Sequence, residues 1–154
     1  MEYQIESRTL AEQATAVMRA SLPVARVGEW LQHTYRDVAG YLDRAGVAIT
    51  GPPIARYTIH DDVMDLEAGF PVGQPTVAEG GVVPSSLPAG SAAVTTHYGR
   101  YEDLAAAHDA VMRWLRDNGH QPRGSHWEVY YTDPVQEPDP TRWRTDVVVP
   151  FAAG

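Results

Sequence analysis

The chain has 154 residues, of which 44% are hydrophobic and 21% charged, a composition typical of one globular domain that buries a core. The formal net charge of −8 argues against direct binding of nucleic acid, because an acidic surface repels phosphate backbones. The absence of cysteine excludes disulfides, thiolate metal ligands and cysteine nucleophiles.

The N-terminal sequence MEYQIESRTL is polar and carries no apolar segment typical of a secretion signal. No apolar run in the chain approaches the roughly 18 residues needed to cross a membrane. We therefore expect a cytoplasmic protein without a membrane partner.

The first half of the chain predicts the order strand–helix–strand–strand. Strand-forming residues near position 3 (YQIES) and at 13–20 precede residues 24–45, where apolar side chains recur every three or four positions, as in a helix. Gly46 follows as the expected left-handed cap of that helix. Two further strands are expected, at 53–59 and 64–70.

The second half predicts the same order. A strand at 91–98 precedes a helix over 101–118, which ends at Gly119, and strands follow at 126–132 and 144–151. The Gly- and Pro-rich segment 73–86 is expected to connect two halves, about 1–72 and 87–154, within a single domain of 154 residues.

The two halves also align residue by residue. Segment 41–57 matches segment 114–130 at a constant offset of 73, with four identical pairs: Leu42 and Leu115, Gly46 and Gly119, Gly51 and Gly124, and Tyr57 and Tyr130. Two of these pairs are turn glycines and one is a strand aromatic, which indicates one unit used twice. We expect an α+β fold of duplicated strand–helix–strand–strand units, forming an antiparallel sheet with two helices on one face and pseudo-twofold symmetry.

A carboxylate lies in the middle of the most aromatic strand, WEVYY at residues 127–131. Strand alternation places Glu128 and Tyr130 on one face. Either that face is wet and Glu128 is a solvating charge, or it lines a cavity, since Glu is depleted in strands. Their repeat equivalents, Ala55 and Tyr57, would share this surface, and a carboxylate among rings suits a hydrophobic cation.

The six histidines do not cluster in the sequence, so we expect neither a metal site nor a cofactor. The segment His60-Asp61-Asp62 reads as a turn with a solvated acidic pair. His97, in a strand, and His108, on a helical stripe, are interpreted as structural histidines.

Five segments together resemble the GyrI-like small-molecule-binding domains, which also serve as effector-binding modules of AraC- and MerR-type multidrug regulators. The resemblance covers most of the chain and rests on these segments in this order: GPPIARY (51–57), DVMDLEAGFPV (62–72), LPAGSAAVTTHYGRYEDL (87–104), WEVYYTDP (127–134) and PDPTRWRTD (138–146). It implies a duplicated fold with a ligand groove at the junction of the halves. Since no helix-turn-helix is visible, the chain looks like a stand-alone member.

The resemblance also implies the site. Glu128 corresponds to the acidic residue at the base of the groove, and Tyr98, Tyr101 and Trp143 correspond to its aromatic walls. The sequence departs from the family pattern where Ser125-His126 precedes the Trp-Glu pair and where Arg100 follows Gly99. Arg100 could pair with Glu128 and weaken cation binding.

Three functions remain open at this point. The first is capture of planar, hydrophobic, cationic small molecules for drug sensing or sequestration, with Glu128, Tyr57, Tyr98, Tyr101, Tyr130 and Trp143 as ligand-binding residues. The second is hydrolysis of cyclopropanoid DNA-alkylating compounds, with Glu128 as general base and Tyr57 or Tyr98 bonding the carbonyl oxygen. The third is a gyrase-inhibitor-like role in protein binding. A homodimer is left open as well.

Overall fold

The computed structural model describes residues 3–153 and divides them into two compact units. Residues 11–88 form one unit, called the middle unit below. Residues 3–10 together with 89–153 form the other, called the terminal unit because it contains both ends of the described chain.

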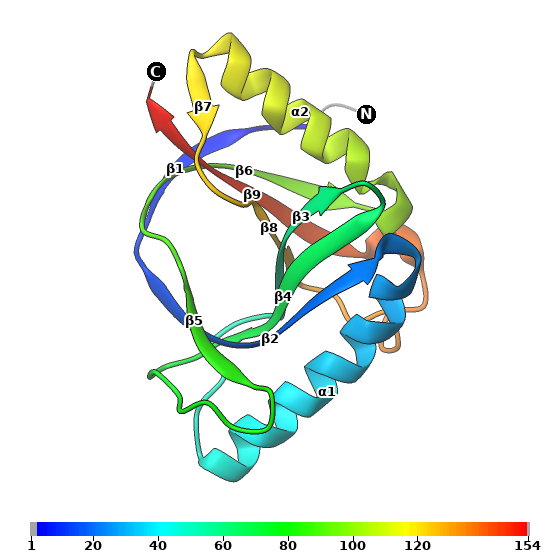
Figure 1. Ribbon diagram of the computed structural model, residues 1–154. Helices are drawn as coiled ribbons and strands as arrows, with labels where there is room; N and C mark the ends of the chain where they lie inside the picture. Colours follow the sequence, from blue (N-terminus) through cyan, green and yellow to red (C-terminus); the bar gives the residue numbers. More distant parts are fainter. Residues whose placement is uncertain (1–2, 154) are drawn as a thin grey trace. The chain divides into compact units, whose positions relative to one another are not determined.

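The middle unit is an antiparallel sheet with one helix. Its strands lie in the order β3-β4-β2-β5, and helix α1 packs on β2 and β4 (Figure 1). The bounds are β2 Gln13–Pro23, a 3-10 turn at Val24–Arg26, α1 Val27–Ala45, β3 Ile54–His60, β4 Val63–Pro71 and β5 Val83–Leu87.

The stripe that predicts α1 is the face that the helix buries. Val38 and Leu42 of α1 are buried against Ala16 of β2 and Val72, just after β4. Gly46 ends the helix with φ 69°, and its N–H bonds to Asp43 O, as a left-handed cap requires.

The hairpin between β3 and β4 turns at Asp61 and Asp62, which have φ of 51° and 65°. Two consecutive positive φ angles are the mark of a tight two-residue hairpin turn. His60 bonds to Asp65 through Nε2 at 2.7 Å. The expected turn at 60–62 is therefore confirmed.

The terminal unit repeats the plan. Its strands lie in the order β1-β6-β9-β8, the short β7 also pairs with β9, and α2 packs on β6, β7 and β9 (Figure 1). The bounds are β1 Glu6–Leu10, β6 Gly90–Tyr98, a 3-10 turn at Tyr101–Asp103, α2 Leu104–Asp117, β7 His120–Pro122, β8 Trp127–Tyr130, a 3-10 turn at Pro140–Arg142 and β9 Arg144–Ala153.

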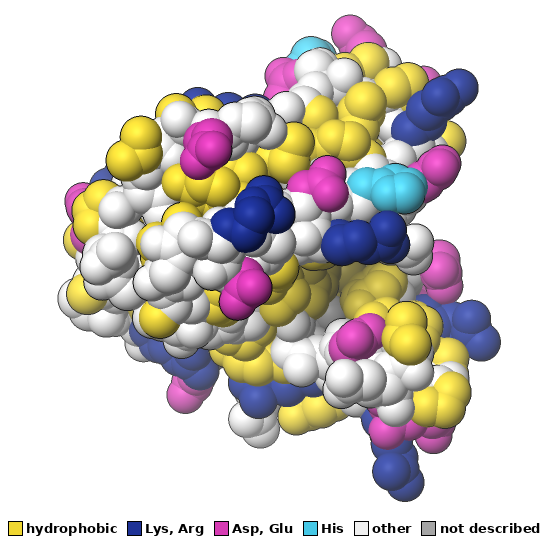
Figure 2. Space-filling model, turned by 90° about the horizontal axis from the view of Figure 1, so that it is seen from below, with side chains coloured by type: hydrophobic (Ala, Val, Ile, Leu, Met, Phe, Trp, Pro, Cys, Tyr) yellow, Lys and Arg dark blue, Asp and Glu magenta, His cyan; other side chains and the backbone are white. Residues whose placement is uncertain are grey.

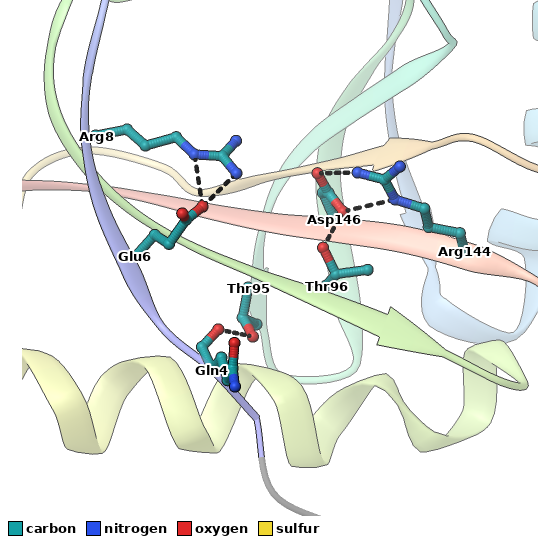
Figure 3. Close-up of polar contacts among 7 residues, drawn as sticks. All are labelled: Gln4, Glu6, Arg8, Thr95, Thr96, Arg144 and Asp146. Carbon is teal, nitrogen blue, oxygen red and sulfur yellow. Dashed lines mark hydrogen bonds and ion pairs between the residues drawn. The ribbon is translucent and has the colours of Figure 1, made fainter.

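The terminal sheet has two chemically different faces. Figure 3 shows Thr95 and Thr96 of β6 on opposite sides of the strand, with Thr95 on the side of α2. Val147 belongs to the core beneath α2, whereas its neighbour Asp146 accepts a 2.7 Å hydrogen bond from Thr96 on the other face. This alternation determines which candidate residues lie on the same face of the sheet.

The α+β class, the antiparallel pairing and the two helices are confirmed, but the expected halves differ from the units. β1 pairs with β6 and so belongs with the second half of the chain, not with residues 11–72. Segment 73–86, expected to be only a linker, contributes most of β5, which pairs with β2. Strand propensity does not reveal this edge strand, because it contains Pro84 and two serines.

Across residues 3–153, neither helix combines the length and apolar character needed to cross a bilayer. All twelve basic side chains are arginines. The basic side chains visible on the face in Figure 2 are interspersed with acidic and hydrophobic side chains.

Gly69 tests the packing of the middle sheet. It lies in β4 between Val17 of β2 and Ile54 of β3, and an added Cβ would overlap the backbone carbonyl of Ala16. We expect Gly69→Ala to lower the free energy of unfolding by about 3 kcal/mol or to prevent folding, as overpacking in a closed core does. Chemical denaturation measures the effect.

Gly28→Ala on α1 is the matched control, because a Cβ there would meet nothing within 4 Å. It should change the free energy of unfolding by less than about 1 kcal/mol. Equal stability of the two variants would contradict the close approach of β2 and β4.

Candidate functional site

Glu128 is a buried carboxylate on the helix-facing side of the terminal sheet. It lies in β8 opposite Val147 of β9, whose side chain belongs to the core beneath α2. Only 4% of the Glu128 surface is exposed. The interpretation of this residue as a solvating charge is therefore wrong, and its burial requires partners, because an unpaired buried charge costs several kcal/mol.

Two side chains are among those partners. Tyr130 donates its hydroxyl to Glu128 Oε1 at 2.6 Å, and His108 Nε2 lies 2.8 Å from Glu128 Oε2. Tyr130 is two residues away on the same strand face, and His108 lies on α2, one turn after Leu104. An ionised carboxylate only accepts hydrogen bonds, so His108 Nε2 carries the proton.

Aromatic rings extend from this carboxylate toward the surface. Tyr101, in the 3-10 turn before α2, meets Tyr130 edge to face at 5.8 Å between ring centroids. On its other side, Tyr101 stacks on Trp143 at 5.2 Å. Trp143 is fixed by a 2.7 Å hydrogen bond from Nε1 to Glu137 O, and Tyr101 itself is 36% exposed.

His126 completes the group from the other side. Its ring lies edge to face against His108 at 4.7 Å. Burial, and secondly the charge of His108, lower the pKa of His126 to about 4, although Glu128 opposes the shift. The six residues Glu128, His108, His126, Tyr130, Tyr101 and Trp143 are called the ring–carboxylate cluster below.

The phenol of Tyr101 is held in its neutral form. Burial raises the pKa of Tyr101 above its ordinary value, and the negative charges of Asp133 and Glu128 act in the same direction. The cluster thus presents a neutral phenol near the surface and a carboxylate at depth. This arrangement suits a ligand whose aromatic rings lie near the surface and whose charged group lies deeper, near Glu128.

Tyr98 lies on the opposite face of the sheet from Glu128. It pairs with Arg144, whereas Tyr130 pairs with Thr145, the next residue along β9. Since successive side chains on a strand point to opposite faces, Tyr98 and Tyr130 are separated by the sheet. Tyr98 is 55% exposed.

That opposite face carries its own polar group. Arg144 lies 3.4 Å from the buried Asp146 (Figure 3) and 4.1 Å above the ring of Tyr131. Hydrogen bonding and the charge of Asp146 raise the pKa of Arg144 against the effect of its partial burial. Arg144 therefore stays charged on the face that Tyr98 shares.

Tyr57 belongs to the middle unit, where it packs against Val27 of α1 and Leu66 of β4. Ala55, two residues earlier, is 1% exposed and pairs with Ala68. Within their own unit, Ala55 and Tyr57 thus face α1, just as Glu128 and Tyr130 face α2. The repeat relation that the sequence predicts holds within each unit.

Arg100 has an exposed side chain, and its carbonyl oxygen accepts a 2.9 Å hydrogen bond from His97 Nε2. His97 also bonds through Nδ1 to the hydroxyl of Tyr3 at 2.8 Å. Both nitrogens of this buried ring are occupied, so the interpretation of His97 as a structural histidine is confirmed.

His108 and His126 are the cluster members that sequence reasoning missed. The signal was present in the repeat: at the same offset of 73, Tyr35 corresponds to His108 and Ala55 to Glu128. In the middle unit, Tyr35 donates its hydroxyl to Ile54 O. The helix and strand positions that carry the uncharged Tyr35 and Ala55 in the middle unit therefore carry His108 and Glu128 in the terminal unit.

Among the described residues, no three His, Asp or Glu side chains gather closely enough to hold a metal ion. The chemistry that the cluster offers is a fixed carboxylate, two hydrogen-bond donors to it and stacking surface. These groups can bind a cation, or can move a proton between Glu128 and a neighbour.

The depressed pKa of His126 predicts acid sensitivity. An unfolded histidine has a pKa near 6.5, whereas folded His126 has a pKa of about 4. Between these values the unfolded state binds the extra proton, so this contribution to stability is complete above pH 6.5 and is lost as the pH falls toward 4. We expect the free energy of unfolding to fall more steeply over this range in the wild type than in His126→Gln, as measured by urea denaturation. Parallel slopes would contradict the buried, neutral ring.

Comparison with known proteins places the chain in a structural group. It superimposes on the EcmrR C-terminal domain with a TM-score of 0.88 at 22% identity, covering 100% of both chains. A hydrolase from Listeria innocua matches at TM-score 0.70 and 11% identity, over 97% of this chain and 92% of that one. SAV2435 bound to tetraphenylphosphonium matches at TM-score 0.62 and 12% identity, over 99% and 94%. At these identities the likenesses show the fold.

The chain also superimposes on EcmrR in its complex with DNA, with a TM-score of 0.86 at 23% identity. That match covers 99% of this chain but only 58% of the EcmrR chain. No curated protein sequence matches the chain. The model of the GyrI-like small-molecule-binding domain matches residues 60–152, more than half of the chain. The chain belongs to the GyrI-like family of small-molecule-binding domains.

Proposed function

We propose that the protein binds flat, hydrophobic cations through the ring–carboxylate cluster of its terminal unit, for sensing or sequestering such compounds. The observation that carries the proposal is Glu128, a carboxylate 4% exposed whose two oxygens each face a hydrogen-bond donor. Hydrogen bonds to a carboxylate favour its charged form. A buried negative charge is thereby available to a cation.

The rings account for the hydrophobic part of the ligand. Tyr101 and Trp143 are stacked with their planes 27° apart, and Trp143 is anchored to the Glu137 carbonyl. Each ring that meets a cation adds about 0.5–2 kcal/mol. Because stacking and cation–π contacts depend little on ligand shape, the cluster is suited to compounds of varied structure.

The solved structure of SAV2435 with tetraphenylphosphonium gives this proposal its test compound. The compound is a lipophilic cation whose charge is independent of pH. The compound as a whole is tetrahedral, but each of its four phenyl rings is flat and can stack on Tyr101 or Trp143, and its phosphonium centre carries the charge opposite to that of Glu128. We propose that this chain binds it.

Glu128→Gln should weaken tetraphenylphosphonium binding about 10- to 100-fold, because a charge-assisted contact is worth about 1.5–3 kcal/mol. Quenching of tryptophan fluorescence or calorimetry measures the dissociation constant. Thermal melting shows whether the variant is folded.

Glu102→Gln serves as the matched control: it removes an equal charge from an exposed position beside Tyr101. It should bind like the wild type. If both variants bind equally, the attraction comes from the net charge of −8 and the proposal fails.

Hydrolysis of cyclopropane-bearing alkylating compounds is the second candidate. The observation that favours it is the same carboxylate with His108 and Tyr130 at 2.8 and 2.6 Å, an arrangement able to activate water and relay its proton. Ring-opened product formed by the wild type and not by Glu128→Gln would establish it. Product formed only at the rate in buffer would exclude it.

A further inference from the structure

His108 lies next to one oxygen of Glu128. Its Nε2 is 2.8 Å from Oε2, with side-chain exposures of 20% for His108 and 5% for Glu128. The pair is neutral overall if the imidazole is protonated, and carries one negative charge if it is not. The charge that a ligand meets therefore depends on His108.

We propose that His108 is the specificity-determining residue of the ring–carboxylate cluster. As a neutral donor through Nε2 it orients the carboxylate for a ligand cation, and as an imidazolium it takes the place of that cation. This inference rests on the proposed function and adds that the protonation state of His108 decides whether the site accepts a cation. The site accepts a permanent cation when His108 is neutral and rejects it when His108 is protonated.

The internal repeat supports a joint role for the two residues. In the middle unit the equivalent helix position is Tyr35 and the equivalent strand position is Ala55. Tyr35 donates to the backbone carbonyl of Ile54, and Ala55 pairs with Ala68 within the sheet. The scaffold therefore folds with an uncharged combination at these positions, and the His–Glu pair serves something beyond folding.

Among the groups that meet His108 from neighbouring elements are Glu128 on β8 and His126 in the loop before it. On its own helix, Asp109 is exposed. His126 titrates far from neutrality, with a pKa of about 4. His126 therefore stays largely neutral as the pH falls from 8 to 5.

Proton and cation compete for one carboxylate, so their binding is linked and each weakens the other. Where His108 must lose a proton before the cation binds, each fall of one pH unit lowers cation affinity about tenfold. Binding of the cation then expels that proton. Tetraphenylphosphonium isolates this effect because its own charge does not change.

The experiment measures tetraphenylphosphonium affinity at pH 5, 6, 7 and 8 for the wild type and for His108→Gln. Glutamine can donate a hydrogen bond from a similar position but does not titrate. We expect the ratio of dissociation constants at pH 5 and pH 8 to be about tenfold or more in the wild type and under about threefold in the variant. His33→Gln, an exposed position on α1, should retain the wild-type ratio.

A second measurement needs no variant. Calorimetry of wild-type binding at pH 5.5 in two buffers of different ionisation enthalpy counts the protons released. We expect release of up to one proton per cation bound, and none in Glu128→Gln.

Different experimental results would overturn the two proposals. Wild-type binding that Glu128→Gln weakens, but that neither varies with pH nor releases protons, overturns the role of His108 and leaves the proposed function standing. An equal pH ratio in His108→Gln and the wild type also overturns that role. Absence of wild-type binding at pH 8 overturns both.

Discussion

The hydrogen bonds from Tyr130 and His108 to Glu128 are the interactions on which the rest of the site depends. They help to compensate the charge of a carboxylate that is only 4% exposed. One donor comes from the same strand face and the other from α2, so the sheet and the helix must both be in place. A site of this kind can exist only on a folded scaffold.

The scaffold itself is made of two versions of one plan, and their difference is informative. In the middle unit Ala55 and Tyr57 face α1. Tyr57 packs among apolar side chains, and Tyr35 of α1 donates its hydroxyl to the backbone oxygen of Ile54. In the terminal unit the same plan carries Glu128, Tyr130 and His108. The proposed function therefore rests on a few residues at positions that the repeat already brings near its helix.

Much of the fold could be predicted from local patterns. The apolar stripes of α1 and α2 and the cap at Gly46 follow from spacing and from glycine's access to positive φ. The pairing of β1 with β6 could not, because it joins residues about 85 positions apart and no local signal encodes it. β5 was missed for a different reason: Pro84 and its serine neighbours read as a loop, and only an edge position tolerates them.

Part of the site could likewise be predicted from the sequence, and part could not. Strand alternation placed Glu128 and Tyr130 on one face, and the resemblance to the family supplied Tyr101 and Trp143. Tyr98 was grouped with them although the register with Arg144 turns it to the other face; a family motif alone does not fix which side of the sheet a residue occupies. His108 was interpreted as structural because a histidine on an apolar stripe usually is, and its contact with Glu128 depends on how α2 lies on the sheet.

A crystal structure of the protein with tetraphenylphosphonium, grown at pH 8, would show whether Glu128 holds the cation. We expect the phosphonium centre nearer to Glu128 than to any other carboxylate, with at least one phenyl ring against Tyr101 or Trp143. A ligand bound elsewhere, or Glu128 oxygens turned into solvent away from His108 and Tyr130, would contradict it.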